Sequence, residues 1–201
     1  MSTRTTARQY WVAIRAMLIF TLVLGVGYTA VITAVGQLAF SAKANGSLIE
    51  ADGESVGSSL IGQGYTDEEG AALPEWFQSR PSAAGDGYDG GASSGSNYGP
   101  ENADLVAAIE DRESAIVELE GVSPERIPAD ALTASASGLD PHISPEYARL
   151  QVERVADARG LTADEVGALV EEHVQGPDVG FLGAPTVNVL ELNIALAELE
   201  G

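Results

Sequence analysis

Residues 16–40 read AMLIFTLVLGVGYTAVITAVGQLAF and contain no charged side chain. At about 1.5 Å of rise per residue, a helix of this length extends roughly 37 Å, enough to cross the hydrocarbon layer of a bilayer with some tilt. We therefore predict a transmembrane helix over residues 15–40. It follows a short tail, residues 1–14, and precedes one domain, residues 41–201.

The charges on either side of this segment predict its orientation. Arg4, Arg8 and Arg15 precede it, whereas only Lys43 follows closely. Because positively charged flanks stay on the cytoplasmic side, we expect the N-terminus in the cytoplasm and the domain outside it. The chain is then a single-pass protein of the cell membrane, with the lipid bilayer as a partner.

A cleaved signal peptide is the competing interpretation. Ala42, Lys43 and Ala44 form a small-residue site of the A-x-A kind after a basic N-terminal region. However, the apolar part of a signal peptide usually has about 7 to 15 residues, so the length of this segment favours a retained anchor.

Small residues recur along the apolar segment. Gly25, Thr29, Thr33 and Gly36 are three or four residues apart, which puts them on one helical face. Such a face lets another membrane helix approach closely, so we expect these four residues to serve helix packing.

Composition excludes several classes of function. Residues 1–49 carry four basic side chains and no acidic one, so the formal net charge of -20 leaves -24 for the remainder. A field this negative repels polyanions, so nucleic acid is not an expected partner. The chain has no cysteine, which excludes disulfides and thiolate metal sites.

The domain is predicted to be mixed α+β. Residues 41–84 favour short strands or loops, and residues 85–100 (GDGYDGGASSGSNYGP) favour a surface loop. A helix is predicted between a cap at Asn102 and a terminating Gly121.

The C-terminal part is predicted to be mainly helical. Ser144 and Pro145 should begin a helix that runs to about Arg159, before Gly160. Thr162 and Glu165 form a capping box for a helix to about Val174. A strand at residues 185–187 should precede a helix that starts after Asn188.

Two motifs match catalytic or phosphate-binding patterns without their context. Gly85, Gly87 and Gly90 spell GxGxxG, and residues 91–95 (GASSG) match the nucleophile elbow around Ser93. Each pattern needs a strand before it and a helix after it, whereas both lie in glycine-rich sequence. We expect neither to act.

The two histidines also give weak signals. Asp140, His142 and Ser144 are close in sequence, but a catalytic triad is defined by geometry, and a turn followed by a helix cap explains them. Two histidines without cysteine are poor material for zinc, although Asp86 and Asp89 could hold a hard cation weakly. We therefore predict no catalytic residue and no metal site.

A series of uncommon phrases supplies a stronger signal. They are GSSLIGQ at residues 57–63, FQSRPSA at 77–83, GSNYGP at 95–100, TASASGLDPHISP at 133–145, QV and RV at 151–155, and VNVL followed by LN at 187–193. Together they resemble the C subunit of the Kdp potassium-transporting ATPase over nearly the whole chain. Thr186 departs from the arginine that this family tends to have there, and the serine-glycine run before Asn97 is permuted.

This resemblance implies a non-catalytic accessory subunit of a high-affinity potassium uptake system. Its partners would be a channel-like potassium subunit and a P-type ATPase subunit. The family's role is assembly, with a proposed second role as a catalytic chaperone that raises the ATP affinity of the pump subunit. The chain alone would bind no cofactor, and Gln63 is the candidate for any contact with ATP.

Polar residues in these phrases are candidates for partner contacts or for holding loops in place: Arg80, Ser96, Asn97, Asp140, His142, Gln151, Arg154 and Asn188. Internal hydrogen bonding in a cysteine-free domain is an equally good explanation for each. A membrane-anchored extracytoplasmic serine hydrolase that uses Ser93 or Ser144 remains the alternative function.

Overall fold

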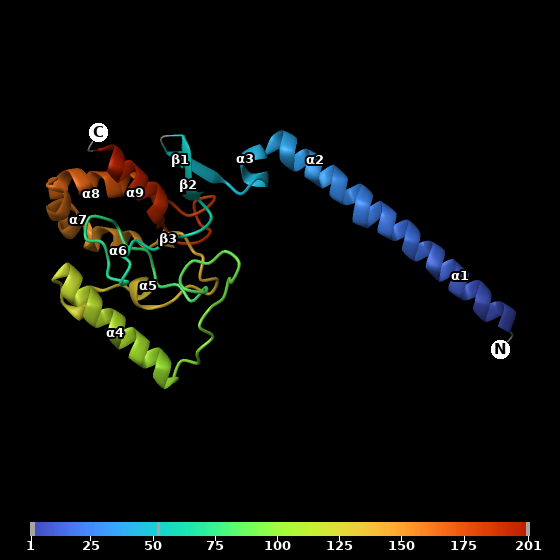
Figure 1. Cartoon of the computed structure of the whole chain (residues 1–201), viewed down its shortest axis with the longest axis horizontal. Helices are drawn as coiled ribbons and strands as arrows, with labels where there is room; N and C mark the ends of the chain where they lie inside the picture. Colours follow the sequence, from blue (N-terminus) through green and yellow to red (C-terminus); the bar gives the residue numbers. More distant parts are fainter. Residues whose placement is uncertain (1–2, 52, 200–201) are drawn as a thin grey trace. The chain divides into compact units, whose positions relative to one another are not determined.

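The computed structural model describes residues 3–51 and 53–199. The chain divides into two compact units, residues 1–48 and residues 49–201. Figure 1 labels the elements of both units.

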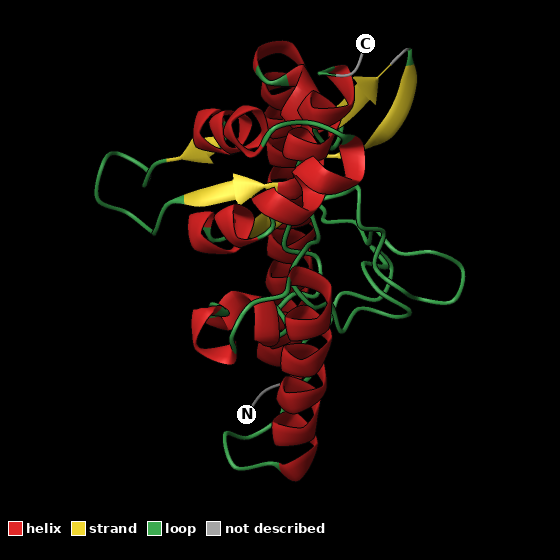
Figure 2. Cartoon of the chain, turned by 90° about the vertical axis from the view of Figure 1, so that its left-hand side faces the viewer, coloured by secondary structure: helices red, strands yellow, loops and turns green. Residues whose placement is uncertain are grey.

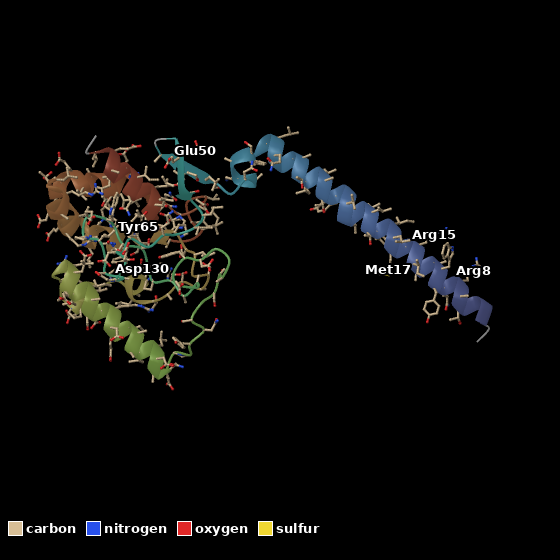
Figure 3. The ribbon with its side chains drawn as sticks, in the orientation of Figure 1. Arg8, Arg15, Met17, Glu50, Tyr65 and Asp130 are labelled. Carbon is tan, nitrogen blue, oxygen red and sulfur yellow. The ribbon has the colours of Figure 1, made fainter. Side chains whose placement is uncertain are left out.

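The N-terminal unit is a long apolar helix. Its elements are α1 (Thr3–Phe20), the π-helical η1 (Thr21–Tyr28), α2 (Thr29–Ala39) and the short α3 (Ser41–Ala44). The helical stretch Thr6–Ala39 contains an 18-residue window with a mean hydropathy of 2.2, and none of that window is buried within the protein. Figure 3 marks Arg8, Arg15 and Met17 on α1. The helix therefore begins well before the apolar segment itself.

The end of α2 is closed by polar contacts. The amide side chains of Gln37 and Asn45 exchange two hydrogen bonds, at 3.2 and 3.1 Å. A Cβ on Gly36 would lie 3.7 Å from Ala44 of α3. Asn45 Nδ2 also donates to Ser41 O at 2.7 Å, so the residues after α2 are tied to one another and to the helix end.

The second unit is an α+β domain, as predicted. Its strands are β1 (Leu48–Ala51), β2 (Glu54–Ser58), β3 (His142–Ile143), β4 (Val174–Gln175) and β5 (Thr186–Asn188). Its helices are α4 (Ala103–Glu120), η2 (Pro124–Arg126), α5 (Ala129–Leu132), α6 (Pro145–Leu150), α7 (Val152–Arg159), α8 (Ala163–Glu172) and α9 (Val189–Glu198).

A small antiparallel sheet organises the core. β5 is its middle strand, where Val187 pairs with Ile143 of β3 on one side and Val174 of β4 on the other. Val187 is fully buried, and so are Leu192 and Leu196 of α9. Helices α6 to α9 supply most of the apolar cluster around the sheet, and Figure 2 shows these helices gathered around the strands.

Most helix ends lie where the sequence predicts them. Asn102 accepts hydrogen bonds from the first turn of α4, and Gly121 ends that helix in the left-handed conformation. Ser144 caps α6 and Thr162 with Glu165 forms a reciprocal capping box on α8. The structure confirms these caps. They could be predicted because a cap depends only on residues close in sequence.

Two predicted helices differ from the structure: the first has the predicted ends but is interrupted inside them, and the second ends two residues early. The helix expected from Ser144 to about Arg159 is interrupted at Gln151, whose N–H bonds to Ala148 O instead of continuing the α-helical pattern. The helix expected to reach Val174 ends at Glu172, because Val174 pairs with Val187 in the sheet. In both cases a tertiary contact overrides local helix preference.

Buried side-chain amides hold the irregular segment of residues 73–82. Asn193 accepts from Phe77 N at 2.9 Å and donates to Phe77 O at 3.0 Å. Gln151 does the same for Gln78, at 2.6 and 3.1 Å. Phe77, Gln151 and Asn193 are all at least 98 % buried. Two consecutive backbone units thus bond to side chains instead of to a strand.

Replacing Asn193 by leucine tests this arrangement. The Asn193→Leu variant keeps the side-chain volume but leaves the buried N–H and C=O of Phe77 without partners, at a cost of about 1–3 kcal/mol for each group. Chemical denaturation of the detergent-solubilised chain should show this loss of unfolding free energy. Glu198→Gln, on the exposed end of α9, is the control, and equal stability of the two variants would contradict the arrangement.

Candidate functional site

Three of the predicted polar residues form one ion-pair cluster. Arg80 Nη1 lies 2.9 Å from Asp140 Oδ2, and His142 Nδ1 lies 3.4 Å from Asp140 Oδ1. Asp140 Oδ1 also accepts from the backbone N–H of His142 at 3.0 Å. Arg80 Nη2 donates to Thr133 O at 3.3 Å. The cluster joins the segment around residue 80 to the segment that leads into β3.

The charges of this cluster favour the ionised carboxylate. The hydrogen bond from His142 and the nearby Arg80 lower the pKa of Asp140, against a smaller opposing effect of partial burial. Tyr88 donates its hydroxyl to Arg80 O. Burial raises the pKa of Tyr88 to about 12, so this hydroxyl remains a donor.

The glycine-rich loop docks against the same region. Ser82 Oγ donates to Gly138 O at 2.6 Å, and Gly138 has a φ of 68°. A Cβ there would lie 2.6 Å from Ser94 O and 2.7 Å from the Ala84 side chain, so only glycine fits. Ser96 and Asn97 are exposed in this loop, where Asn97 donates to Gly95 O at 3.0 Å.

Arg154 forms a buried ion pair that the sequence phrases did not suggest. Its Nε lies 2.9 Å from Glu120 Oε1, and the side chains are only 7 % and 1 % exposed. It also donates to Trp76 O at 3.0 Å and to Gln151 Oε1 at 2.8 Å. Burial raises the pKa of Glu120 more than Arg154 lowers it. Arg154 thus ties α4 and α7 to the segment around Trp76.

Asn188 connects the sheet with the residues after β2. Its Nδ2 donates to Ser59 O at 2.9 Å, and its Oδ1 accepts from Glu191 N at 3.2 Å as the cap of α9. Arg80, Asp140, His142, Gln151, Arg154 and Asn188 therefore all make contacts within the domain. Ser96 and Asn97 are the two of the eight that lie on the exposed loop.

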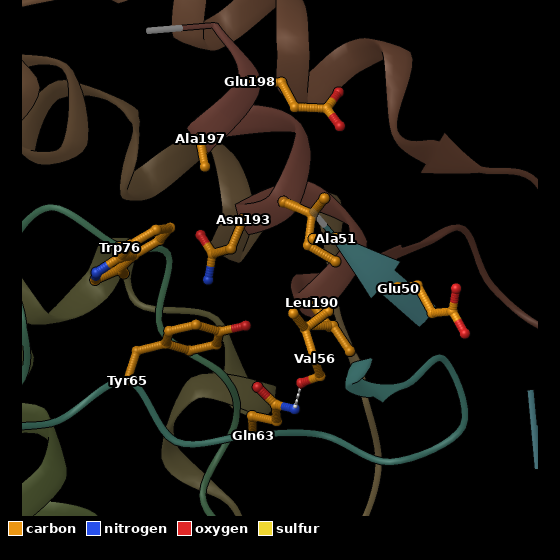
Figure 4. Close-up of a pocket in the computed structure, with 11 residues that line it drawn as sticks. Glu50, Ala51, Val56, Gln63, Tyr65, Trp76, Leu190, Asn193, Ala197 and Glu198 are labelled. Carbon is orange, nitrogen blue, oxygen red and sulfur yellow. Dashed lines mark hydrogen bonds between the residues drawn. The ribbon is translucent and has the colours of Figure 1, made fainter. Parts of the chain in front are cut away.

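Gln63 lines a cavity of about 670 Å³ (Figure 4). Its Nε2 donates to Val56 O at 2.7 Å, which fixes β2. Apolar side chains of α9 form one wall, Tyr65 and Trp76 form another, and Glu50 and Glu198 lie at the edge. Tyr65 and Trp76 are stacked with their centroids 5.9 Å apart.

The aromatic wall was missed at the level of sequence. The Arg159 guanidinium lies 4.2 Å from the Trp76 ring centroid. Tyr65 Oη is buried and has no hydrogen-bond partner of normal geometry among the described residues. Burial raises the pKa of Tyr65, and the nearby Asn193 amide offsets this only in part. No spacing rule links these residues.

The cavity does not fit a nucleotide triphosphate. None of the described residues that line it is Lys or Arg, whereas two of them are glutamates. A triphosphate needs basic side chains, backbone N–H groups or a metal ion around it. Gln63 is also committed to Val56 O. The surroundings instead suit an apolar or cationic group.

The serines of the alternative hydrolase make structural contacts. Ser144 Oγ donates to Asp130 Oδ1 at 2.9 Å and accepts from Tyr147 N at 3.1 Å; Asp130 is labelled in Figure 3. Ser93 Oγ donates to Ser137 O at 2.9 Å. A nucleophile needs a general base within hydrogen-bond reach, and the hydrogen bonds described for these serines include none to histidine.

Metal-ligating side chains are not clustered in the described part of the chain. Among residues 3–51 and 53–199, no group of three or more His, Asp or Glu side chains is arranged to hold an ion. Asp89 Oδ1 instead accepts from Gly91 N at 2.8 Å, which stabilises a turn.

The small residues of the membrane helix fall in two elements. Gly25 lies in the π-helical η1, and Thr29, Thr33 and Gly36 lie in α2. All four residues are exposed or half-exposed within the described unit. This face is therefore available for packing against another membrane helix.

These features define a protein with one N-terminal helix that is long and apolar enough to span a membrane and one small α+β domain, whose polar sequence phrases make contacts mainly within that domain. The family model "K+-transporting ATPase, c chain" (KdpC) matches residues 10–198. The chain belongs to this family, and it is a subunit of a potassium-transporting ATPase complex.

Close relatives cover almost the full length. A "Potassium-transporting ATPase KdpC subunit" of Kineococcus radiotolerans is 53 % identical over 94 % of this chain and 93 % of its own. The protein of the same name from Caulobacter vibrioides is 53 % identical over 92 % and 90 %. That of Mycobacterium bovis is 46 % identical over 96 % and 99 %. The resemblance drawn from the sequence phrases is thereby confirmed.

Replacing Asp140 by asparagine should change how the stability of the domain depends on pH in the acidic range. A carboxylate whose pKa is lowered on folding stabilises the protein above its unfolded pKa, and this contribution is lost as pH falls through the folded pKa. The deficit of Asp140→Asn relative to wild type should therefore be full at pH 7 and shrink below pH 3.8. Thermal unfolding at both ends of this range measures it.

The exposed Glu153→Gln on α7 provides the matched control, since it removes a carboxylate outside the cluster. A deficit for Asp140→Asn that stays constant from neutral to acidic pH would show that its charge does not contribute.

Proposed function

We propose that this chain is the assembly subunit of a high-affinity, ATP-driven potassium uptake system. It stabilises the contact between a channel-like potassium subunit and a P-type ATPase subunit, and it has no catalytic residue or cofactor of its own. The observation that carries this proposal is the combination of one bilayer-length helix with a domain whose candidate polar residues mostly make hydrogen bonds inside the domain.

The membrane helix supports this role in two ways. Thr6–Ala39 is long and apolar enough to span a bilayer. Its small-residue face suits close contact with helices of the other subunits. Arg8 and Arg15 precede the uncharged segment, residues 16–40, and favour a cytoplasmic N-terminus, so the acidic domain lies outside the cytoplasm in this proposal.

Single cysteines test the orientation, because the natural chain has none. Glu110→Cys places a thiol on the exposed side of α4, and Arg8→Cys places one near the start of the helix. A membrane-impermeant maleimide added to intact cells should label the variant at position 110 and leave the variant at position 8 unlabelled until the cells are permeabilised. Labelling in the opposite order would overturn the proposed orientation.

The second role, raising the ATP affinity of the pump subunit, is proposed to act through subunit contacts. The cavity at Gln63 has an acidic edge and apolar walls, which disfavour a triphosphate. The proposed orientation also puts the domain on the side away from cytoplasmic ATP. The membrane helix, packed through Gly25, Thr29, Thr33 and Gly36, is the part of the chain that reaches both sides.

The Gln63→Ala variant distinguishes a role of Gln63 in ATP binding from a role in the structure of the domain. Loss of the hydrogen bond to Val56 O should destabilise the domain by about 0.5–1.5 kcal/mol. The ATP concentration that gives half-maximal hydrolysis by the complete purified complex should stay within about twofold of wild type. A larger rise in that concentration, with unchanged thermal stability, would restore Gln63 as a nucleotide ligand.

A further inference from the structure

The turn between β4 and β5 exposes a group of large apolar side chains. Val179 is 82 % exposed, Phe181 74 % and Leu182 55 %. We call residues 177–183 the apolar hairpin tip. In Figure 2 it belongs to the loop that joins two strands and projects to one side of the helices. A soluble surface rarely displays adjacent large apolar residues unless they bind something.

The tip is held rigidly. Asp178 and Leu182 exchange two backbone hydrogen bonds of 2.9 Å, and Gly180 N donates to Pro177 O at 3.0 Å. Phe181 N adds a further bond to Asp178 O at 3.2 Å. The side chains are therefore presented in a fixed arrangement, which lowers the entropy lost on binding.

One residue of the tip has an unfavourable backbone conformation. Val179 has a φ of 55°, in the left-handed region that a β-branched residue seldom adopts. Its side chain is exposed, so packing within the domain does not explain the choice of valine. Strain of this kind is typical of positions kept for a function.

The tip could bind a lipid surface, a second copy of this chain or another protein subunit, and the charges around it distinguish these partners. Residues 160–201 contain no Lys or Arg, and Asp178 itself is acidic. Anchoring on an anionic lipid surface relies on basic side chains, so this region is poorly suited to lipid. A second copy would bring another strongly acidic domain against it, which like-charge repulsion opposes.

We propose that the apolar hairpin tip inserts into an apolar cleft, bordered by basic side chains, on another protein subunit of the same potassium-transporting complex. Phe181 and Leu182 fill the cleft, and the carboxylate of Asp178 faces its basic border. This inference rests on the proposed function, because it requires the complex in which the chain is an assembly subunit.

Photo-crosslinking in the complete complex tests which molecule the apolar hairpin tip contacts. A benzoylphenylalanine residue at position 181 should, on irradiation, join this chain covalently to one other subunit, identified by mass spectrometry. The same residue at position 106, which is 45 % exposed on α4, is the control for non-specific capture. Adducts only with lipid, only with a second copy, or no more frequent than at position 106 would each overturn the inference.

Variants of the tip measure its contribution. Phe181→Ser with Leu182→Ser should lower retention of this chain by the complex at least about tenfold in detergent washes, as loss of a central apolar contact does. Asp178→Arg should weaken retention more at low salt than at high salt. Retention equal to wild type for both would refute the proposed contact.

Val179→Asn distinguishes binding from folding. Asparagine tolerates the left-handed conformation, so the thermal midpoint of this variant should equal or exceed that of wild type, while retention falls. A lower midpoint would mean that valine serves the fold. If wild-type chain is itself not retained with the other subunits, the proposed function fails; if wild type is retained and the tip variants are too, only the hairpin inference fails.

Discussion

Phe77 and Gln78 cross the interior of the domain without a neighbouring strand, and their backbone groups must still find partners because unpaired groups are costly when buried. Asn193 from α9 and Gln151 from between α6 and α7 provide them, each with a pair of hydrogen bonds. Arg154 then donates to both Gln151 and the backbone of Trp76. The irregular segment and the helical core are thereby fixed to one another.

This constraint explains why most polar residues of the family phrases are unavailable for chemistry. Arg154 is needed against buried Glu120, Asn188 holds Ser59 and caps α9, and Asp140 links Arg80 with His142. A domain with no cysteine has no disulfide to fix such irregular segments, so hydrogen bonds and ion pairs do it. What stays accessible is acidic surface, the exposed loop with Ser96 and Asn97, and the apolar hairpin tip.

Local features were predictable from the sequence, and long-range ones were not. The apolar segment, the caps at Asn102 and Ser144, and the Thr162 capping box depend on residues within a few positions of each other. The amide pairs join residues 116 and 73 positions apart, and an amide side chain has no periodicity that reveals its partner. The interruption at Gln151 coincides with such a pair. Because the partner of Gln151 cannot be recognised in the sequence, a continuous helix was expected there.

The sheet connects the buried amide of Asn193, which binds the backbone of Phe77, to the surface. Val187 of β5 pairs with β4, whose other end leads directly into the hairpin tip. The next residue, Asn188, caps α9, and Asn193 follows five residues later on that helix. Residues 174–193 therefore contain the tip, the central strand of the sheet and Asn193, one of the two residues whose side-chain amides bind residues 77 and 78. The backbone hydrogen bonds within the tip and the ladder between β4 and β5 connect the tip to the buried strand, so the core supports the conformation of the tip.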